Sequence, residues 1–179
     1  MKLEIKSDQN GQKDNETIGY KPSKKVVDLL IDYALIGLSD KKLYYEIADF
    51  YKDKGYPHMC SMSKMLTNHL GEAFDDIKCH INIFDIAITC DSEKTNEKYE
   101  SEMDAFEIMY DLEKDRLSAL NDIMLTISEE KDFIHMDLVQ TIVKKQLSVY
   151  RHMQNAYKIM KRDGNLDLKG RDIIESVRF

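Results

Sequence analysis

The stretch that decides the fold runs from Met103 to Ile127 and reads MDAFEIMYDLEKDRLSALNDIMLTI. Its apolar residues recur at steps of three and four, the spacing of the inward face of an α-helix in a bundle. The expected inward positions are Phe106, Tyr110, Glu113, Leu117, Leu120, Met124 and Ile127. Glu113 interrupts this apolar series with a carboxylate. Because burial of an unpaired carboxylate is costly, Glu113 needs a cation, a hydrogen-bond donor or a metal as its partner.

A second stripe, meaning a series of inward helix positions with the same spacing of three and four residues, follows downstream. Its one strongly polar member is Gln146. The positions are Val139, Ile142, Gln146, Val149, Met153, Ala156 and Met160. Two helices are therefore predicted to direct a polar group toward their interior. Each group also has a purely structural interpretation: Lys41 or a tyrosine hydroxyl could satisfy Glu113, and Gln146 could be a hydrogen-bonded core amide.

The composition predicts one all-α domain. The chain has 179 residues, 42% of them hydrophobic, which is enough for a sizeable core. It has only two prolines and seven glycines, and so lacks the turn signals of a many-stranded protein. We expect a polar N-terminal tail over residues 1–22 and a helical bundle domain over residues 23–179.

Charge, cysteines and hydropathy narrow the location and the partners. The net charge of −7 disfavours nucleic acid as a partner. Three scattered cysteines without a CxxC pair fit reduced thiols. We find no long uncharged apolar run, and the charged N-terminus lacks the apolar centre of a signal peptide. The sequence therefore predicts a cytoplasmic protein with no membrane partner.

Four long helices and a short fifth one are expected. The predicted ranges are about 23–53, 58–88, 99–128 and 132–161, with the fifth at roughly 168–177. A helix of about 28 residues is about 42 Å long, so a connection between parallel neighbours needs more than ten extended residues. Only the connection between the second and third helices is long enough. We therefore expect two antiparallel hairpins joined by one long crossover.

Several segments resemble eukaryotic-type ferritins. Ala105 to Lys114, AFEIMYDLEK, is similar to the third ferritin helix, whose Leu-Glu-Lys supplies a glutamate of the ferroxidase centre. Leu43 to Tyr51, LYYEIADFY, is similar to the aromatic end of the first helix, and Tyr44 falls on the tyrosine beside that centre. The resemblance extends over about residues 26–164. It implies a ferritin-like four-helix bundle with a long crossover, a short C-terminal fifth helix, and assembly into an oligomeric cage.

The resemblance also implies a metal site formed by Glu72, Asp75, Glu113 and Gln146, with Tyr44 beside it and iron as the metal. This site departs from the family pattern in two places. Asp75 stands where ferritins have a histidine. The glutamate that bridges both irons aligns with Gly37, which has no side chain, and Asp40, one turn further on, could substitute for it if the helix rotates.

Other iron-related positions are changed as well. The cavity-facing glutamates of the second helix fall on Gly71, Phe74 and Ile77, and the acidic pair of the three-fold channel falls on Met136 and Val139. His69 and His80, eleven residues apart, are interpreted as ordinary polar residues rather than as a surface metal site.

These observations predict a subunit of an iron-storage cage whose own ferroxidase activity is reduced or absent. It would self-associate, either alone or with a catalytically active ferritin subunit. The alternative is an iron-free ferritin-like oligomer with a structural or chaperone-like role.

Overall fold

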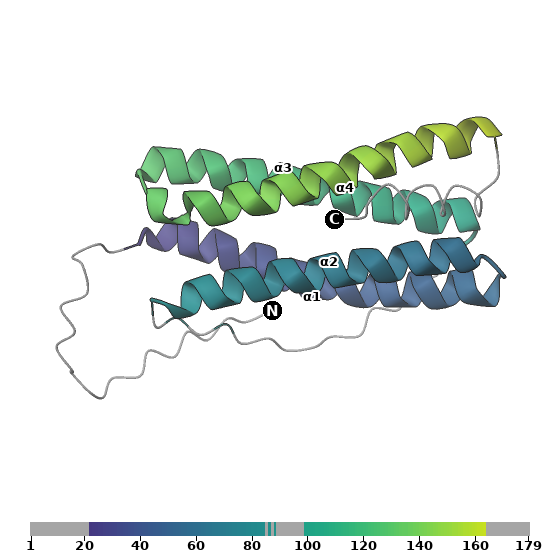
Figure 1. Cartoon of the computed structure of the whole chain (residues 1–179), viewed down its shortest axis with the longest axis horizontal. Helices are drawn as coiled ribbons and strands as arrows, with labels where there is room; N and C mark the ends of the chain where they lie inside the picture. The colour runs from purple at the N-terminus through teal and green to yellow at the C-terminus, as the bar shows by residue number, and fades with distance from the viewer. Residues whose placement is uncertain (1–21, 85, 87, 89–98, 164–179) are drawn as a thin grey trace.

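Four long helices form the bundle in the computed structural model, which describes residues 22–84, 86, 88 and 99–163 (Figure 1). The helices are α1 (Lys24–Asp53), α2 (Pro57–Asn82), α3 (Glu102–Glu130) and α4 (Met136–Asp163), with a short 3-10 helix, η1 (Phe133–His135), before α4. The predicted all-α bundle is confirmed. Within these residues, no helix is long and apolar enough to cross a membrane.

The helices form two antiparallel hairpins. Helix α1 packs against α2 and α3 packs against α4, while α1 also contacts α3 and α2 contacts α4. In Figure 1, α2 ends at the left end of the bundle and α3 begins at the right end, so both run in the same direction. The end of α2 and the start of α3 therefore lie at opposite ends of the bundle, which confirms the predicted long connection between these helices.

Local sequence explains most helix ends. Gly55 has a φ of 79° in the turn after α1, and Pro57 opens α2, where a missing backbone N–H does no harm. Helix α3 begins at the N-cap Ser101, whose Oγ accepts a 3.1 Å hydrogen bond from the backbone N–H of Asp104. It ends at Lys131, which adopts the left-handed conformation with a φ of 56°.

Some predicted boundaries need correction. Helix α2 ends at Asn82 instead of near residue 88, and η1 precedes α4, which begins at Met136 instead of near residue 132. Ser23 stands at the N-cap of α1, but its hydroxyl donates to Glu130 instead of capping the helix. The expected fifth helix and most of the expected N-terminal tail lie outside the described residues.

The structure buries one of the two predicted stripes in full and the other only in part. Every expected inward position of α4 is buried, from Val139 to Met160. In α3 the buried face is shifted by one residue at three steps. Tyr110, Leu117 and Met124 are only partly buried, and their neighbours Met109, Arg116 and Ile123 are buried instead.

The hydrophobic core is divided into two clusters along the bundle. One is built from the C-terminal half of α1, the N-terminal half of α2, the start of α3 and the end of α4, and contains Ile47 and Phe106. The other uses the opposite halves of the same helices and contains Leu30 and Ile127. Between them lies a set of buried polar side chains from all four helices.

A buried polar layer as the candidate site

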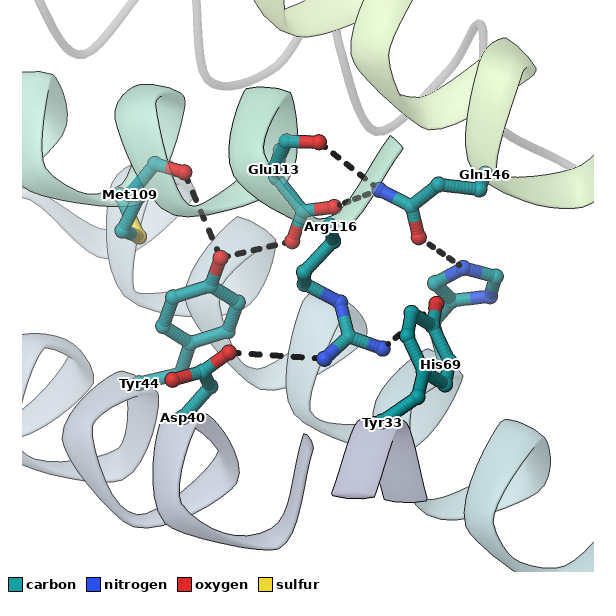
Figure 2. Close-up of polar contacts among 8 residues, drawn as sticks. All are labelled: Tyr33, Asp40, Tyr44, His69, Met109, Glu113, Arg116 and Gln146. Carbon is teal, nitrogen blue, oxygen red and sulfur yellow. Dashed lines mark hydrogen bonds and ion pairs between the residues drawn. The ribbon is translucent and has the colours of Figure 1, made fainter. Parts of the chain in front are cut away.

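Seven side chains make up this polar layer, which Figure 2 shows together with Met109. They come from α1 (Tyr33, Asp40 and Tyr44), α2 (His69), α3 (Glu113 and Arg116) and α4 (Gln146), and all are buried. The heptad-like spacing of the helices places one or more polar positions of each helix at the same height in the bundle.

Glu113 is held by the chain's own donors. It is fully buried, and its Oε1 accepts a 2.6 Å hydrogen bond from the Tyr44 hydroxyl. Its Oε2 accepts a short hydrogen bond from Nε2 of Gln146, which also donates to the backbone carbonyl of Glu113 at 3.3 Å. Oε1 of Gln146 lies 3.4 Å from Nε2 of His69. Because the amide oxygen can only accept, this hydrogen bond requires a proton on Nε2 of His69.

Arg116 supplies the positive charge of the layer. It is 4% exposed, its Nη1 lies 3.4 Å from Oδ2 of Asp40, and its Nη2 donates to the Tyr33 hydroxyl at 3.0 Å. The guanidinium carbon also lies 4.7 Å from the centre of the Tyr33 ring, within range of a cation–π interaction. A guanidinium ion is therefore fixed in the interior of the bundle by an aspartate and a tyrosine.

Two glycines make room for cationic side chains. A Cβ atom added to Gly37 would lie 3.1 Å from Nη1 of Arg116, and one added to Gly71 would lie 3.0 Å from Nζ of Lys41. Both separations are closer than ordinary van der Waals contact. The absence of a side chain at Gly37 thus leaves the space that the guanidinium fills.

Burial and charge shift several pKa values in the layer. Burial raises the pKa of Asp40, and the Arg116 guanidinium opposes this with a smaller effect. Burial acts to lower the pKa of Arg116, but the surrounding Tyr33, Glu113, Tyr44 and Asp40 together raise it above its ordinary value. Arg116 therefore stays charged.

The two aromatic hydroxyls and the histidine remain neutral near pH 7. Burial raises the pKa of Tyr33 to about 12. Burial and the neighbouring Glu113 raise the pKa of Tyr44 well above its usual value. Burial lowers the pKa of His69, and Glu113 opposes this effect. Neutral hydroxyls can donate to Glu113 and accept from Arg116, which is the pattern observed.

The structure brings together only part of the predicted metal site. Glu113, Gln146 and Tyr44 meet in the polar layer, whereas the side chain of Glu72 is 65% exposed and Asp75 is exposed as well. Nζ of Lys145 lies 3.9 Å from Glu72, a surface ion pair between α4 and α2. A metal role for Glu72, Asp75, Glu113 and Gln146 stays a prediction.

The residues of the layer do not fit a two-iron centre. Such a centre needs several carboxylates or imidazoles directed at one point, and across residues 22–84 and 99–163 no group of three or more His, Cys, Asp or Glu side chains is arranged to hold a metal. Both oxygens of Glu113 already accept hydrogen bonds. Moreover, the guanidinium of Arg116 would repel an added cation.

Sequence reasoning missed three members of the layer: Tyr33, His69 and Arg116. The signal for Arg116 was its spacing, three residues after Glu113 and four before Leu120, which continues the inward stripe. Leu117 fits the same stripe and is apolar, so hydropathy favoured the wrong neighbour. His69 lies seven residues after Met62 and so shares its face of α2, but the sequence does not show which face of α2 meets Gln146.

Comparison with known proteins finds solved structures with a similar fold. A humanized archaeal ferritin matches with a TM-score of 0.77 and 16% sequence identity, over 89% of this chain and 99% of that one. A ferritin from M. penetrans matches with a TM-score of 0.75 and 14% identity, over 85% of this chain and 94% of the other. The chain therefore has a ferritin-like fold. No protein-family model matches the sequence, and neither does any curated protein.

Proposed function

We propose that this protein is a subunit of a ferritin-like oligomeric shell and has no ferroxidase centre of its own. The observation that carries the proposal is the Arg116 guanidinium beside Gly37, inside the polar layer. A fixed organic cation in this position supplies positive charge to the layer and pairs with the Asp40 carboxylate.

The chemistry of iron oxidation supports the proposal that this subunit has no ferroxidase centre. A two-metal site works because bridging carboxylates offset the repulsion between two cations and position the reacting oxygen between them. Here Gly37 provides no bridging group, and Glu113 is bonded to Tyr44 and Gln146. Two ferrous ions, as substrate, would have to displace these hydrogen bonds and sit beside a guanidinium in a poorly solvated interior, where like charges repel strongly.

Assembly into a shell is supported by the fold and by the surface of α1. Proteins with this fold that are named ferritins match nearly their whole length to this chain. Ile36 on α1 is 56% exposed, an apolar side chain of the kind that contact with another subunit would cover. In this proposal, iron enters as cargo and is oxidised by a catalytically active companion subunit.

A second candidate is an iron-free structural or chaperone-like shell. It is favoured by the positions of two lysines: Lys41 fills the space beside Gly71, and Lys145 lies within 4 Å of the carboxylates of both Glu72 and Asp76. The ion pairs of Lys145 reduce the number of carboxylates that are available to bind iron.

Two measurements on the purified full-length chain test the main proposal. Sedimentation velocity should show a species many times heavier than the 20.9 kDa chain, and a monomer would exclude a shell. Oxygen consumption after addition of ferrous salt should match the protein-free buffer, and rapid oxidation of ferrous ions would exclude the inactive-subunit assignment. Mixing with an active ferritin subunit then separates the candidates, because only the storage subunit is expected to co-assemble and retain iron.

A further inference from the structure

Two histidines lie side by side at the end of the bundle where α2 ends and the connection from α3 to α4 is made. His80 is on α2 and His135 is in η1, and their ring centres are 5.1 Å apart. His135 is fully buried, and His80 is partly buried. This histidine pair is separate from the polar layer and has no part in the function proposed above.

His135 is oriented by a carboxylate. Its Nδ1 lies 2.8 Å from Oδ1 of Asp132, which is itself buried and accepts a 2.7 Å hydrogen bond at Oδ2 from the backbone N–H of Ser23. An ionised carboxylate can only accept, so Nδ1 of His135 carries a proton. In the neutral ring, Nε2 is then an unprotonated nitrogen with a free lone pair.

Both histidines keep an unused nitrogen. Nε2 of His135 and Nε2 of His80 are buried, and neither has a hydrogen-bond partner among the described residues. Unpaired buried polar atoms are rare in folded proteins and call for an explanation. Packing of the rings with each other explains their contact but leaves both nitrogens without a partner.

We infer that His80 and His135 bind one divalent transition ion of the zinc or copper type through their Nε2 atoms, with Asp132 as the group that orients His135. Imidazole nitrogen is a preferred ligand of these ions, and a metal-binding histidine commonly donates its other N–H to a carboxylate. Two imidazoles bound to one ion at about 2.0 to 2.1 Å, with a tetrahedral angle between them, have ring centres roughly 5 Å apart. The observed ring separation satisfies this condition.

An aromatic ring packs against both histidines. The ring of Phe84 lies 5.9 Å from that of His80 and 5.5 Å from that of His135, and so covers the pair with an apolar group. Since two protein ligands leave positions for water, we expect weaker binding than at a four-ligand structural zinc site. Binding would link α2 to the α3–α4 connection and so stabilise this end of the bundle.

Calorimetric titration of the metal-free, full-length protein with zinc chloride tests the inference. We expect one zinc ion per chain, at least about tenfold weaker binding in His80→Gln and in His135→Gln, and a loss of about 10- to 100-fold in Asp132→Asn. His58→Gln, which changes a histidine at the opposite end of α2, is the control and should bind zinc as the unmodified protein does.

Two results would overturn the inference: no saturable zinc binding by the unmodified protein, or undiminished binding by His80→Gln. Since His135 is buried, its replacement can prevent folding. His80 is partly exposed, so His80→Gln is expected to fold, which circular dichroism checks, and it decides the question without the His135 variant. The outcome does not depend on the shell proposal, because neither histidine belongs to the polar layer.

Discussion

At the scale of single residues, the central feature is a charged side chain where hydropathy predicts a leucine. Arg116 is stabilised in the interior by an ion pair with Asp40, a hydrogen bond to Tyr33 and the face of the Tyr33 ring. Buried ion pairs add little net stability compared with apolar residues of similar size, but loss of one partner leaves an uncompensated charge. Arg116 and Asp40 are therefore expected to behave as a unit.

The first prediction concerns this pair. Arg116→Met should lower the free energy of unfolding by about 3 to 5 kcal/mol, because the Asp40 carboxylate would be left buried and unpaired. The double variant Asp40→Asn/Arg116→Met should recover most of this loss. Urea denaturation of the three proteins provides the measurement. If the single variant loses less than about 1 kcal/mol, Arg116 does not hold the buried position described here.

The second prediction concerns the hydroxyl that donates to Glu113. Tyr44→Phe keeps the buried ring but removes a 2.6 Å hydrogen bond to a carboxylate, so it should cost about 1.5 to 3 kcal/mol. The matched control is Tyr51→Phe on the same helix, which removes a 2.7 Å hydrogen bond to the backbone carbonyl of Glu102 and should cost about 1 kcal/mol. Equal losses in the two variants would show that Glu113 does not depend on Tyr44.

At the scale of the helices, sequence periodicity was sufficient to predict the buried face of a helix where the inward residues are apolar. The stripe of α4 was predicted in full, and each of its inward residues except Gln146 is apolar. The stripe of α3 was only partly predicted, since Arg116 and Leu117 both fit the spacing. The choice between them depends on Asp40 and Tyr33, which are distant in sequence.

For Glu72, too, the spacing in the sequence does not decide whether the side chain points inward. Its spacing places it near the inward face of α2, but small shifts in helix rotation decide whether such a residue meets the layer or the solvent. In the structure, His69 and Leu70 take the inward positions and Glu72 is exposed. Part of the candidate site was therefore predictable from the sequence, namely the polar positions Glu113 and Gln146 and the neighbouring Tyr44. The ion pair that occupies the layer was not.

The third prediction concerns the contact between α2 and α4, which depends on pH through His69. Burial holds the pKa of His69 below its ordinary value of 6.5, so the folded protein binds fewer protons than the unfolded chain in this range. The stability from His69 is complete above about pH 6.5 and is lost as the pH falls through the lower folded pKa. Asp40 acts in the opposite sense, because its raised pKa favours the folded state at acidic pH.

Comparison of the unmodified protein with His69→Gln isolates this contribution. Between about pH 7.5 and about pH 5.5 the unmodified protein should lose more unfolding free energy than the variant, because glutamine can donate to Gln146 without titrating. His58→Gln is the control and should follow the unmodified protein. Parallel pH profiles for all three proteins would contradict the assignment of a neutral His69 in the polar layer.

At the scale of the whole molecule, the fold is ferritin-like, whereas the described residues of the polar layer do not fit a two-iron centre. Helix lengths and the position of the long crossover are those of a ferritin-like bundle, and both could be predicted because they depend on periodicity and loop length. The interior joins the four helices through hydrogen bonds and one ion pair, in which the Arg116 guanidinium lies beside Asp40. Fold similarity alone is therefore not evidence that this chain has ferroxidase activity.

The most direct test of the central claim is anomalous X-ray diffraction at the iron edge, from crystals of the full-length protein soaked without oxygen in ferrous salt. The account predicts electron density for the Arg116 guanidinium between Asp40 and Tyr33, with no iron peak within the polar layer. A zinc-type ion beside His80 and His135 would bear only on the separate histidine site. Two iron peaks a few ångströms apart, with Glu113 as a ligand and Arg116 displaced, would contradict the account.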